Sequence, residues 1–568
     1  MLKMKSMFER KKVLPLVLTL ANSIIKKLGM VELINRSVEW DPDHWEVTPG
    51  DLAKLIVLST FFDIRTPLTH LADRFEGIDL DFFISAQSKS CGVNSFNAGR
   101  ALERIGHSDY GKIYETLALS AIKQADIPTQ RLHADTTTIS FYGEYDIDLS
   151  HLTREEQEEY LEIERGYNKD GRPQCKQVVV GQIVNEEGMP ISSRTMDGST
   201  SDVDWNVQAV GYLKQLQAKG FVYGIFAADS KLVTHELVSS MNQEDSRVTF
   251  VSRCPSNFEG KLEERQIQRA YEADNWEDMG QFHEGKKAAV YRVQSFREEV
   301  CGSPMRLLVL ESSSLKEKAR ETLEKKKEGL GPAIKALEKK VFRCEADAGE
   351  ERKRFDQEKG MKQFTCVCQI EKKRIEKWPR GRRGADTKPK IEESFHIHVI
   401  GIEEREEECE RFLRKESCIM LISNAPEKYS DRELLETYKG QQVVENSFRE
   451  LKSPRLASVI YLKKPERVEA LGMLLTFSLL IRAIIQYRLR EGLREYKERE
   501  PEGELRVGWG NSVLKTPTYR LLYEHSINCY FEKEALGEYS FAWPTVETKE
   551  RVSVLLNLYG IELEELVE

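Results

Sequence analysis

The sequence has no excess of positive charge. Its 85 Lys and Arg residues are outnumbered by 94 Asp and Glu residues, and the formal net charge is -9. This balance excludes a protein that binds nucleic acid through its overall charge. Any such contact must come from local patches.

The sequence also lacks a cysteine framework. Its 10 Cys residues are scattered along 568 residues, which favours a reducing compartment and buried thiols over a disulfide scaffold. Cys366 and Cys368 form a Cys-x-Cys pair in a strand-like segment, but no second pair follows at zinc spacing. His396 and His398 stand in a similar segment. We interpret all four as packing residues rather than metal ligands.

A cleaved signal and a confident membrane span are missing as well. The N-terminal apolar run is short, is followed by Lys26 and Lys27, and lacks an Ala-x-Ala-like cleavage site, so an amphipathic helix is predicted. The most apolar later run, residues 471–485, is shorter than about 18 residues and contains Arg482, which predicts a buried helix. We expect a soluble cytoplasmic protein with no membrane partner.

The chain does contain enough apolar sequence for several domains. Hydrophobic residues make up 40% and aromatic residues 9%, which excludes global disorder. Residues 1–125 show helical periodicity. The pattern then changes to a Thr- and Ile-rich strand, a hairpin with an NEEG turn, and helix, strand, helix and strand near residues 203–219, 221–229, 232–242 and 247–253. This is the element order of an RNase H-like sheet.

The order breaks after residue 253. The next segment mixes short strands with a charged stretch that predicts a helix, a GLGP turn and a second helix. The predicted fold class is α/β, with an RNase H-like mixed sheet core interrupted by a large α+β insertion, and with helical N-terminal and C-terminal regions. The corresponding domains are residues 1–125, 126–253 (first part of the core), 254–418 (insertion), 419–485 (second part of the core) and 486–568.

Positive charge concentrates in residues 372–390, KKRIEKWPRGRRGADTKPK. This basic segment contains Lys373, Arg380, Arg382 and Arg383. A flexible surface loop and a contact with nucleic-acid phosphates both explain it, and the pattern alone leaves the two open.

Two aspartates stand out in the predicted core strands. Asp135 lies inside the first strand, in HADTTTI, and Asp229 ends the fourth, in GIFAAD. Taken alone, Asp229 is explained as a helix cap and Asp135 as a solvent-facing strand residue. In this strand order, however, the middle of the first strand lies beside the end of the fourth. We therefore expect the two carboxylates to be neighbours.

A helix predicted over residues 438–452 carries a third carboxylate. Its apolar stripe at i, i+4 and i+7 consists of Val444, Phe448 and Leu451. Tyr438, Glu445 and Lys452 are seven residues apart and share a second face. For this helix alone, an ordinary solvated face is a sufficient explanation.

Together the three carboxylates predict a metal site. Three ionised carboxylates at one point repel by about 4 kcal/mol per close pair at an effective dielectric near 20, so a cation or a proton must offset them. Mg²⁺ binds through one or two carboxylates and phosphate oxygens, and paired ions stabilise in-line phosphoryl transfer. Lys452 is then a candidate phosphate-binding cation.

These residues resemble the DDE transposases of bacterial insertion sequences, in the IS-four superfamily. The family signature is Tyr, two residues, Arg, three residues, Glu, six residues and Lys, and Tyr438, Glu445 and Lys452 stand at matching positions. The Arg position holds Gln441, whose neutral amide lacks the bidentate charge of a guanidinium; Arg449 is nearby.

Other blocks carry the same resemblance. HADTTTISFYGEY and residues 166–202 are similar to the first catalytic block of the family. FAADSKLV is similar to the second, with Ser230 where the family more often has Asp-Arg or Asp-Lys-Gly. LPLVLTLANSIIKKLGMVELINRSV and RTPLTHLADRF resemble a helical domain that precedes the core. The matches cover roughly residues 10–255 and 415–485.

The resemblance implies a transposase that cuts DNA at the ends of its own insertion element and joins them to target DNA. It implies Asp135, Asp229 and Glu445 as catalytic metal ligands for Mg²⁺, with Mn²⁺ as a substitute. It also implies double-stranded DNA as partner, a homodimer in the active complex, and association with the nucleoid. The expected DNA contacts are the N-terminal helical domain and Tyr438, Gln441, Arg449, Lys452, Lys169, Arg172, Lys373, Arg380, Arg382 and Arg383.

Two alternatives remain at this point. One is an RNase H-like nuclease that hydrolyses DNA without strand transfer, which an assay for joined products separates. The other is a catalytically decayed DNA-binding protein. Gln441 and Ser230 favour this alternative, whereas the intact set of Asp, Asp and Glu argues against it. Inverted repeats flanking the gene distinguish it from an active transposase.

Overall fold

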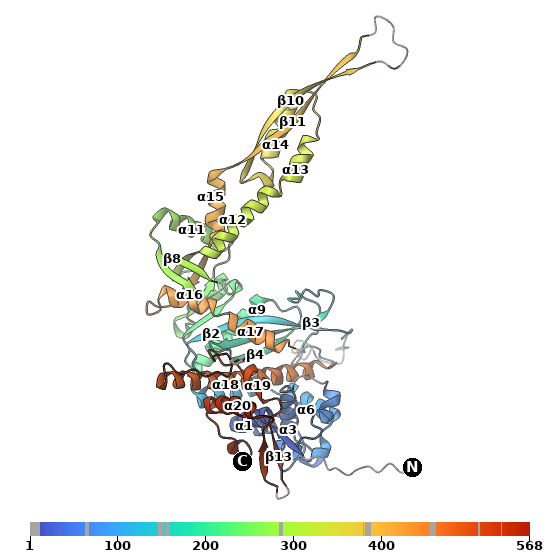
Figure 1. The fold of residues 1–568 in the computed structure, drawn as a ribbon, viewed down its shortest axis with the longest axis vertical. Coiled ribbons are helices and arrows are strands. Elements are labelled where there is room, and N and C mark those ends of the chain that lie inside the picture. The colour runs from blue at the N-terminus through green and yellow to red at the C-terminus, as the bar shows by residue number, and fades with distance from the viewer. Residues whose placement is uncertain are drawn as a thin grey trace. The chain divides into compact units, whose positions relative to one another are not determined.

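A computed structural model describes residues 12–568 except 63–66, 146–152, 154–159, 283–287, 379, 381–387, 454–461, 509, 511, 535 and 536. The chain divides into two compact units (Figure 1). Unit 1 comprises the chain up to Leu232, Ser240–Phe250 and Glu436–Glu568. Unit 2 comprises Val233–Ser239 and Val251–Leu435.

Unit 1 is built around a mixed sheet. Its strands are β2 (Arg131–Phe141), β3 (Lys176–Asn185), β4 (Pro190–Met196) and β5 (Ile225–Ala228), hydrogen-bonded in the order β4-β3-β2-β5. β3 is antiparallel to both β2 and β4, whereas β5 is parallel to β2. β6 (Phe250–Arg253) starts at the last residue of a unit 1 segment, and just before it the carbonyl of Thr249 accepts a backbone hydrogen bond of 2.8 Å from Phe226 of β5. This is RNase H-like topology, and the predicted fold class is confirmed.

Helices cover both faces of this sheet. Thr136 of β2 is bonded to Asp202, the first residue of α9 (Asp202–Ala218), and Gly181, opposite Thr136 on β3, lies against the Trp205 ring of α9. The opposite face carries α17 (Gln442–Leu451), which packs against β2 and β3. The sheet therefore lies between α9 and α17.

The N-terminal and C-terminal regions of unit 1 are mainly helical. Their longer helices are α1 (Leu16–Leu28), α2 (Met30–Ser37), α3 (Pro49–Ser59), α6 (Ser95–Gly106), α7 (Tyr110–Ala125), α18 (Pro465–Arg499), α19 (Tyr519–Ser526) and α20 (Val546–Tyr559). α18 is long and apolar enough to cross a membrane, but 83% of its apolar window is buried. It packs against α3, α6, α7, α20 and β4. The predicted buried helix is confirmed.

A small sheet joins the two ends of the chain and was not expected from the sequence. β1 (Val13–Pro15) pairs with β13 (Tyr530–Lys533), which pairs with β14 (Tyr539–Ala542). All three strands are antiparallel to their neighbours. The first and last parts of the chain thus share one compact unit.

Unit 2 contains strands in the order β6-β12-β9-β8-β7, and each neighbouring pair in this order is antiparallel. The bounds are β7 (Glu277–Phe282), β8 (Ala289–Val300), β9 (Ser303–Ser312) and β12 (Cys418–Ser423). The unit also contains α10 (His235–Met241), which begins in it, α11 (Leu262–Ala273) and α15 (Glu406–Ser417).

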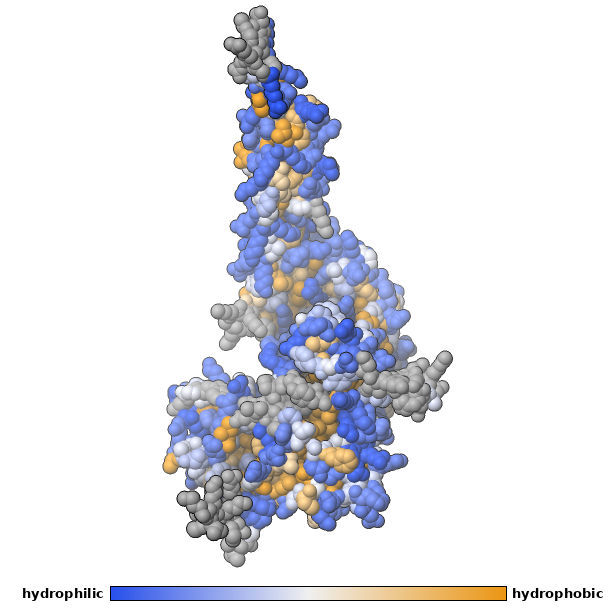
Figure 2. Space-filling model, turned by 90° about the vertical axis from the view of Figure 1, so that its right-hand side faces the viewer, coloured by the Kyte–Doolittle hydropathy of each residue, from blue (hydrophilic) through white to orange (hydrophobic). Residues whose placement is uncertain are grey.

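A long hairpin extends from unit 2. It pairs β10 (Phe364–Lys377) with β11 (Lys390–Glu404) and is accompanied by α12 (Ser313–Glu328), α13 (Gly331–Glu338) and α14 (Glu345–Asp356). The sequence predicted a single second helix after the GLGP turn; this was wrong, because the chain leaves the helix between α13 and α14. The surface of this part is mostly hydrophilic (Figure 2).

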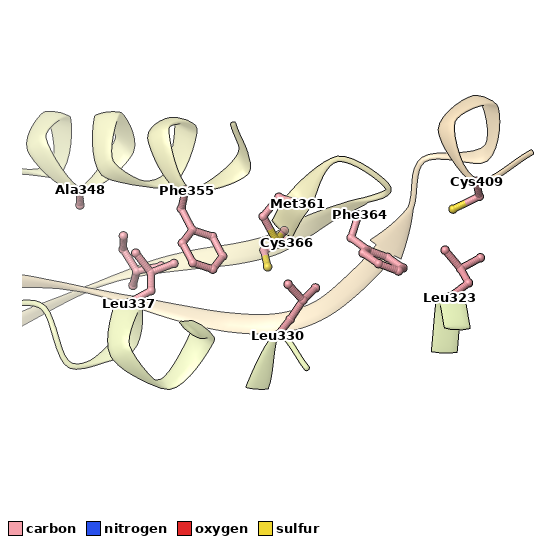
Figure 3. Packing of buried hydrophobic residues seen from close by; sticks show 10 residues of the cluster. Leu323, Leu330, Leu337, Ala348, Phe355, Met361, Phe364, Cys366 and Cys409 are labelled. Atoms are coloured by element: carbon pink, nitrogen blue, oxygen red, sulfur yellow. The ribbon is translucent and has the colours of Figure 1, made fainter. Parts of the chain in front are cut away.

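The hairpin and its helices enclose their own apolar core (Figure 3). Leu337, Phe355 and Phe364 pack there together with the buried thiol of Cys366, and Cys368 packs partly against the cluster. His398 lies on the hairpin surface and pairs with Glu371. The interpretation of Cys366 and Cys368 as packing residues is confirmed.

Candidate active site

Strand register brings Asp135 and Asp229 level with each other. In the parallel pairing of β2 and β5, His133 stands opposite Ala227. Two residues further along each strand, the same offset sets Asp135 beside Asp229, which directly follows β5. The expected neighbourhood of the first and fourth core strands is therefore present.

Both carboxyl groups have raised pKa values. Burial, with smaller contributions from the charges of Asp229 and Asp202, raises the pKa of Asp135 to about 6 against the opposing effect of Lys169. Burial and the charge of Asp202 also raise the pKa of Asp229. Ionising either carboxyl group is therefore unfavourable, and a nearby cation stabilises the ionised form.

Lys169 supplies one such positive charge. Its Nζ lies 2.9 Å from Oδ1 of Asp202 and 3.6 Å from Oδ1 of Asp135, and donates to the carbonyl and hydroxyl oxygens of Thr136. Only 27% of its side chain is exposed. The ammonium group is therefore part of the carboxylate cluster. The contact of Lys169 with DNA that the sequence predicted stays a prediction.

The loop that carries Lys169 is pinned to the sheet. The Asn168 side chain donates to Ser140 and Gln177 and accepts from the backbone N–H groups of Asp170 and Arg172. The side chain of Asp170 accepts a bond of 2.6 Å from Lys452, which caps α17. One loop thus links the carboxylate cluster to the end of α17.

The helix predicted over residues 438–452 is in fact two helices, so the continuous helix was wrong. α16 (Asp431–Lys439) ends before Gly440, and α17 starts at Gln442. The apolar stripe is confirmed: Val444, Phe448 and Leu451 are all buried. Tyr438 lies in α16 and Lys452 caps α17. The two residues therefore do not share the face of one continuous helix, as the sequence had predicted.

The junction leaves no room for a side chain at residue 440. A Cβ at Gly440 would lie 2.9 Å from Cε1 of the buried His133 ring and 3.1 Å from its Nε2. The α16–α17 junction therefore approaches β2 closely. His133 and Asp135 are two residues apart on one strand and share a face, so this junction lies on the face to which Asp135 belongs.

A buried hydrogen bond fixes α17 beside Asp135. Gln182 stands directly opposite Asp135 on β3, and its Oε1 accepts a bond of 2.8 Å from the Ser447 hydroxyl. Opposite residues in an antiparallel pair share a face. Ser447 is two residues beyond Glu445, so the helix carrying Glu445 docks on this part of the sheet.

Glu445 itself is exposed. Its side chain makes no hydrogen bond or ion pair with any residue that the structure describes. Among the described side chains, Asp135, Asp229 and Glu445 do not form a group with ligand atoms within 4.8 Å of one another. In this structure Glu445 does not complete a three-carboxylate cluster.

Two of three comparisons with known proteins give a match. Residues 12–119 match a family described as a domain of unknown function, DUF4277. A cryo-EM structure of the piggyBac transposase synaptic complex with hairpin DNA aligns over 96% of this chain and 87% of that chain, with 11% identity and a TM-score of 0.36. No curated protein matches the sequence. The fold assignment therefore rests on strand order and register.

The remaining predicted DNA contacts are spread over both units. Tyr438 and Gln441 are partly buried near the α16–α17 junction, and the exposed Arg449 donates to Asn446. Arg172 is exposed and donates to Tyr142. Their contact with DNA stays a prediction.

In the basic segment the described charges are largely paired. Lys373 lies 3.4 Å from Glu371, and Glu393 pairs with both Lys372 and Arg374. Arg380 is exposed, and Arg382 and Arg383 lie outside the described residues.

Sequence reasoning missed Asp202. It stands at the start of α9, and its Oδ1 accepts from both Thr136 and Lys169. Sequence alone indicates a helix start there, because Ser201 and Asp204 form a capping box. Its approach to Asp135 depends on how α9 packs on the sheet, which no local pattern reveals.

Proposed function

We propose that the protein is a DDE transposase that cuts DNA at the ends of its own insertion element and joins those ends to target DNA. The observation that carries the proposal is the register that sets Asp135 level with Asp229 on an RNase H-like sheet. The docking of α17 beside Asp135 through Ser447 and Gln182 supports Glu445 as the third acidic residue.

The donor set fits a hard divalent cation. Asp135 and Asp229 offer carboxylate oxygens, the ligands that Mg²⁺ and Mn²⁺ prefer, and burial, together with neighbouring carboxylate charge, raises the pKa of both. Glu445 is exposed and bound to no described side chain, so its carboxylate is available to turn toward the site. A bound divalent cation supplies charge stabilisation to a reacting phosphoryl group.

The protein's own residues have distinct tasks in this proposal. Asp135, Asp229 and Glu445 hold the cation. Lys169 balances the acidic charge before DNA binds and keeps Asp135 and Asp202 in place. Lys452, the residue that caps α17, holds the loop of Asp170 and offers a cation for a phosphate of the cut strand.

DNA binding is proposed for two further parts. The helical N-terminal region recognises the element ends, in line with the family resemblance. The hairpin strands β10 and β11 add phosphate contacts that do not depend on sequence. Homodimerisation in the DNA complex completes the proposal.

The test compares Glu445→Gln with Lys452→Ala. Glu445→Gln keeps the size of the side chain and removes its charge, so folding and binding to element ends should persist while cleavage in Mg²⁺ is lost. Lys452→Ala should reduce both binding and rate, because it frees the Asp170 loop and removes a cation. Glu495→Gln, on an exposed side chain of α18, is the matched control.

A gel shift and a cleavage assay on the element's own ends measure both steps. Normal cleavage by Glu445→Gln would refute the assignment of Glu445. Cleavage by the native chain without joined products would favour the RNase H-like nuclease over the transposase.

A further inference from the structure

Three side chains of unit 2 form a cluster that the proposed reaction does not use. They are His235 at the start of α10, Glu259 in the turn after β6, and Cys301 in the β8–β9 turn. Their ligand atoms all lie within 4.8 Å of one another. Each comes from a different segment, so the cluster is a product of the tertiary fold.

The distances match a metal site. Sγ of Cys301 lies 3.3 Å from Nδ1 of His235 and 3.7 Å from Oε1 of Glu259, and Nδ1 of His235 lies 3.4 Å from the same Oε1. Tetrahedral Zn²⁺ with its usual bond lengths separates sulfur, nitrogen and oxygen ligands by about 3.3–3.6 Å. A zinc ion therefore fits with only small movements of the three side chains.

The charge and donor types select zinc. A thiolate, a carboxylate and a neutral imidazole together carry two negative charges, which balance one Zn²⁺. Sulfur and nitrogen donors disfavour Mg²⁺, which requires oxygen ligands. No described lysine or arginine pairs with Glu259, so its charge is not already neutralised by a protein cation.

Backbone conformation adds an independent indication. Cys301 and Gly302 have φ values of 52° and 72° and connect β8 to β9. A two-residue hairpin turn with both φ values positive prefers Asn or Gly at its first position. Glu259 also has a positive φ, of 44°. Strained non-glycine residues of this kind gather at ligand and functional sites, and turn preference does not explain the cysteine.

A second cluster in the described chain shows the contrast. Glu103, His107 and Glu466 also bring ligand atoms within 4.8 Å of one another. Glu103, however, pairs with Lys464 at 2.8 Å and with Arg467 at 2.7 Å. Protein cations already balance that carboxylate, so this group is explained as an ion-pair network.

We propose that His235, Glu259 and Cys301 bind one Zn²⁺ ion, with water in the fourth position. Binding releases the thiol proton of Cys301 to solvent. The ion ties the start of α10, the turn after β6 and the β8–β9 turn together within unit 2. This role is structural and independent of the cation proposed at Asp135 and Asp229.

The test uses the full-length protein, stripped of metal and kept in excess Mg²⁺ so that oxygen-only sites are filled. Co²⁺ serves as a spectroscopic probe, and Zn²⁺ affinity is measured against a chromophoric chelator. One equivalent of Co²⁺ should give a thiolate-to-metal charge-transfer band. Cys301→Ser should abolish that band and weaken Zn²⁺ binding by more than about tenfold, the lower end of the effect of losing an outer-shell partner.

Matched variants separate metal binding from folding. Cys344→Ser is the control, because Cys344 is an exposed thiol of the same unit and its role as the cap of α14 suits serine. His235→Gln and Glu259→Gln should each weaken Zn²⁺ binding while leaving the metal-free unfolding midpoint near that of the native chain. Zn²⁺ should raise that midpoint in the native chain and in Cys344→Ser, and in none of the three variants of the cluster.

Two results would overturn the proposal. One is a native chain that gives no thiolate band with Co²⁺. The other is a Cys301→Ser protein that binds Zn²⁺ as tightly as the native chain.

Discussion

Gly440→Ala tests whether the approach of the α16–α17 junction to β2 positions the proposed site. The added Cβ would lie 2.9 Å from Cε1 of His133, whose ring is buried. The φ of Gly440 is not in the left-handed region, so alanine is compatible with the backbone and any cost is steric. α17 must then move away from the sheet by a fraction of an ångström or more.

The expected magnitude follows from two opposing effects. Overpacking a buried site costs about 1–3 kcal/mol, and replacing glycine by alanine returns about 0.4–1 kcal/mol through the unfolded chain. The net loss in free energy of unfolding should be about 0–2.6 kcal/mol, which leaves the protein folded. Cleavage should fall by about 100-fold, because displacing a positioned group by about 1 Å has an effect of that order.

Chemical unfolding and the cleavage assay on element ends measure the two effects. Gly211→Ala on α9 is the matched control: its Cβ meets open space, and helix propensity predicts a gain of about 0.5–1 kcal/mol. Adding His133→Ala to Gly440→Ala should relieve the clash and give a coupling energy in a double-mutant cycle. Native cleavage by Gly440→Ala, or no coupling with His133, would refute the reasoning.

Two further predictions concern charge. Burial raises the folded-state pKa of Asp135 to about 6, so the stability that this group contributes is present below its unfolded pKa near 3.9 and is lost as pH rises through about 6. Above about pH 6, Asp135→Asn should therefore make the metal-free protein more stable than the native chain in thermal unfolding. Stability curves of the two proteins that stay parallel across this pH range would contradict the prediction. Glu393 pairs with Lys372 and Arg374, so Glu393→Gln should free both cations, tighten DNA binding and steepen its salt dependence by up to about one unit per new phosphate contact. An unchanged slope would mean that the hairpin is an ordinary solvated surface.

Local patterns in the sequence predicted the strands of unit 1 because each strand has its own composition and alternation. Asp135 and Asp229 were placed correctly in relation to those strands, since each sits in or at the end of an apolar run. The break near Gly440 was missed, and the close approach of that glycine to the His133 ring comes from a segment about 300 residues away in the sequence. The turn of Lys169 toward Asp202 was missed for the same reason.

Pairing across long separations was also invisible in the sequence. β1 and β13 are only a few residues long, and neither has a sequence pattern that indicates which strand it pairs with. The cluster of His235, Glu259 and Cys301 has no recognisable spacing, because its members come from three segments. Sequence reasoning searched for cysteine pairs, whereas this cluster uses a single cysteine.

The pairing of β1 with β13 sets the order in which the newly made chain matures. β1 leaves the ribosome first, but its partner strand is made roughly 500 residues later, after about 25–100 s at 5–20 residues per second. During that interval Val13 of β1 has its partner Ile78 available, but the edge of β1 that later pairs with β13 is exposed to wrong pairing. Most of unit 2 is encoded in one continuous stretch, Val251–Leu435, and is made before Glu445. A nascent chain that stops before Glu445 therefore contains unit 2 but lacks the third of the proposed acidic residues.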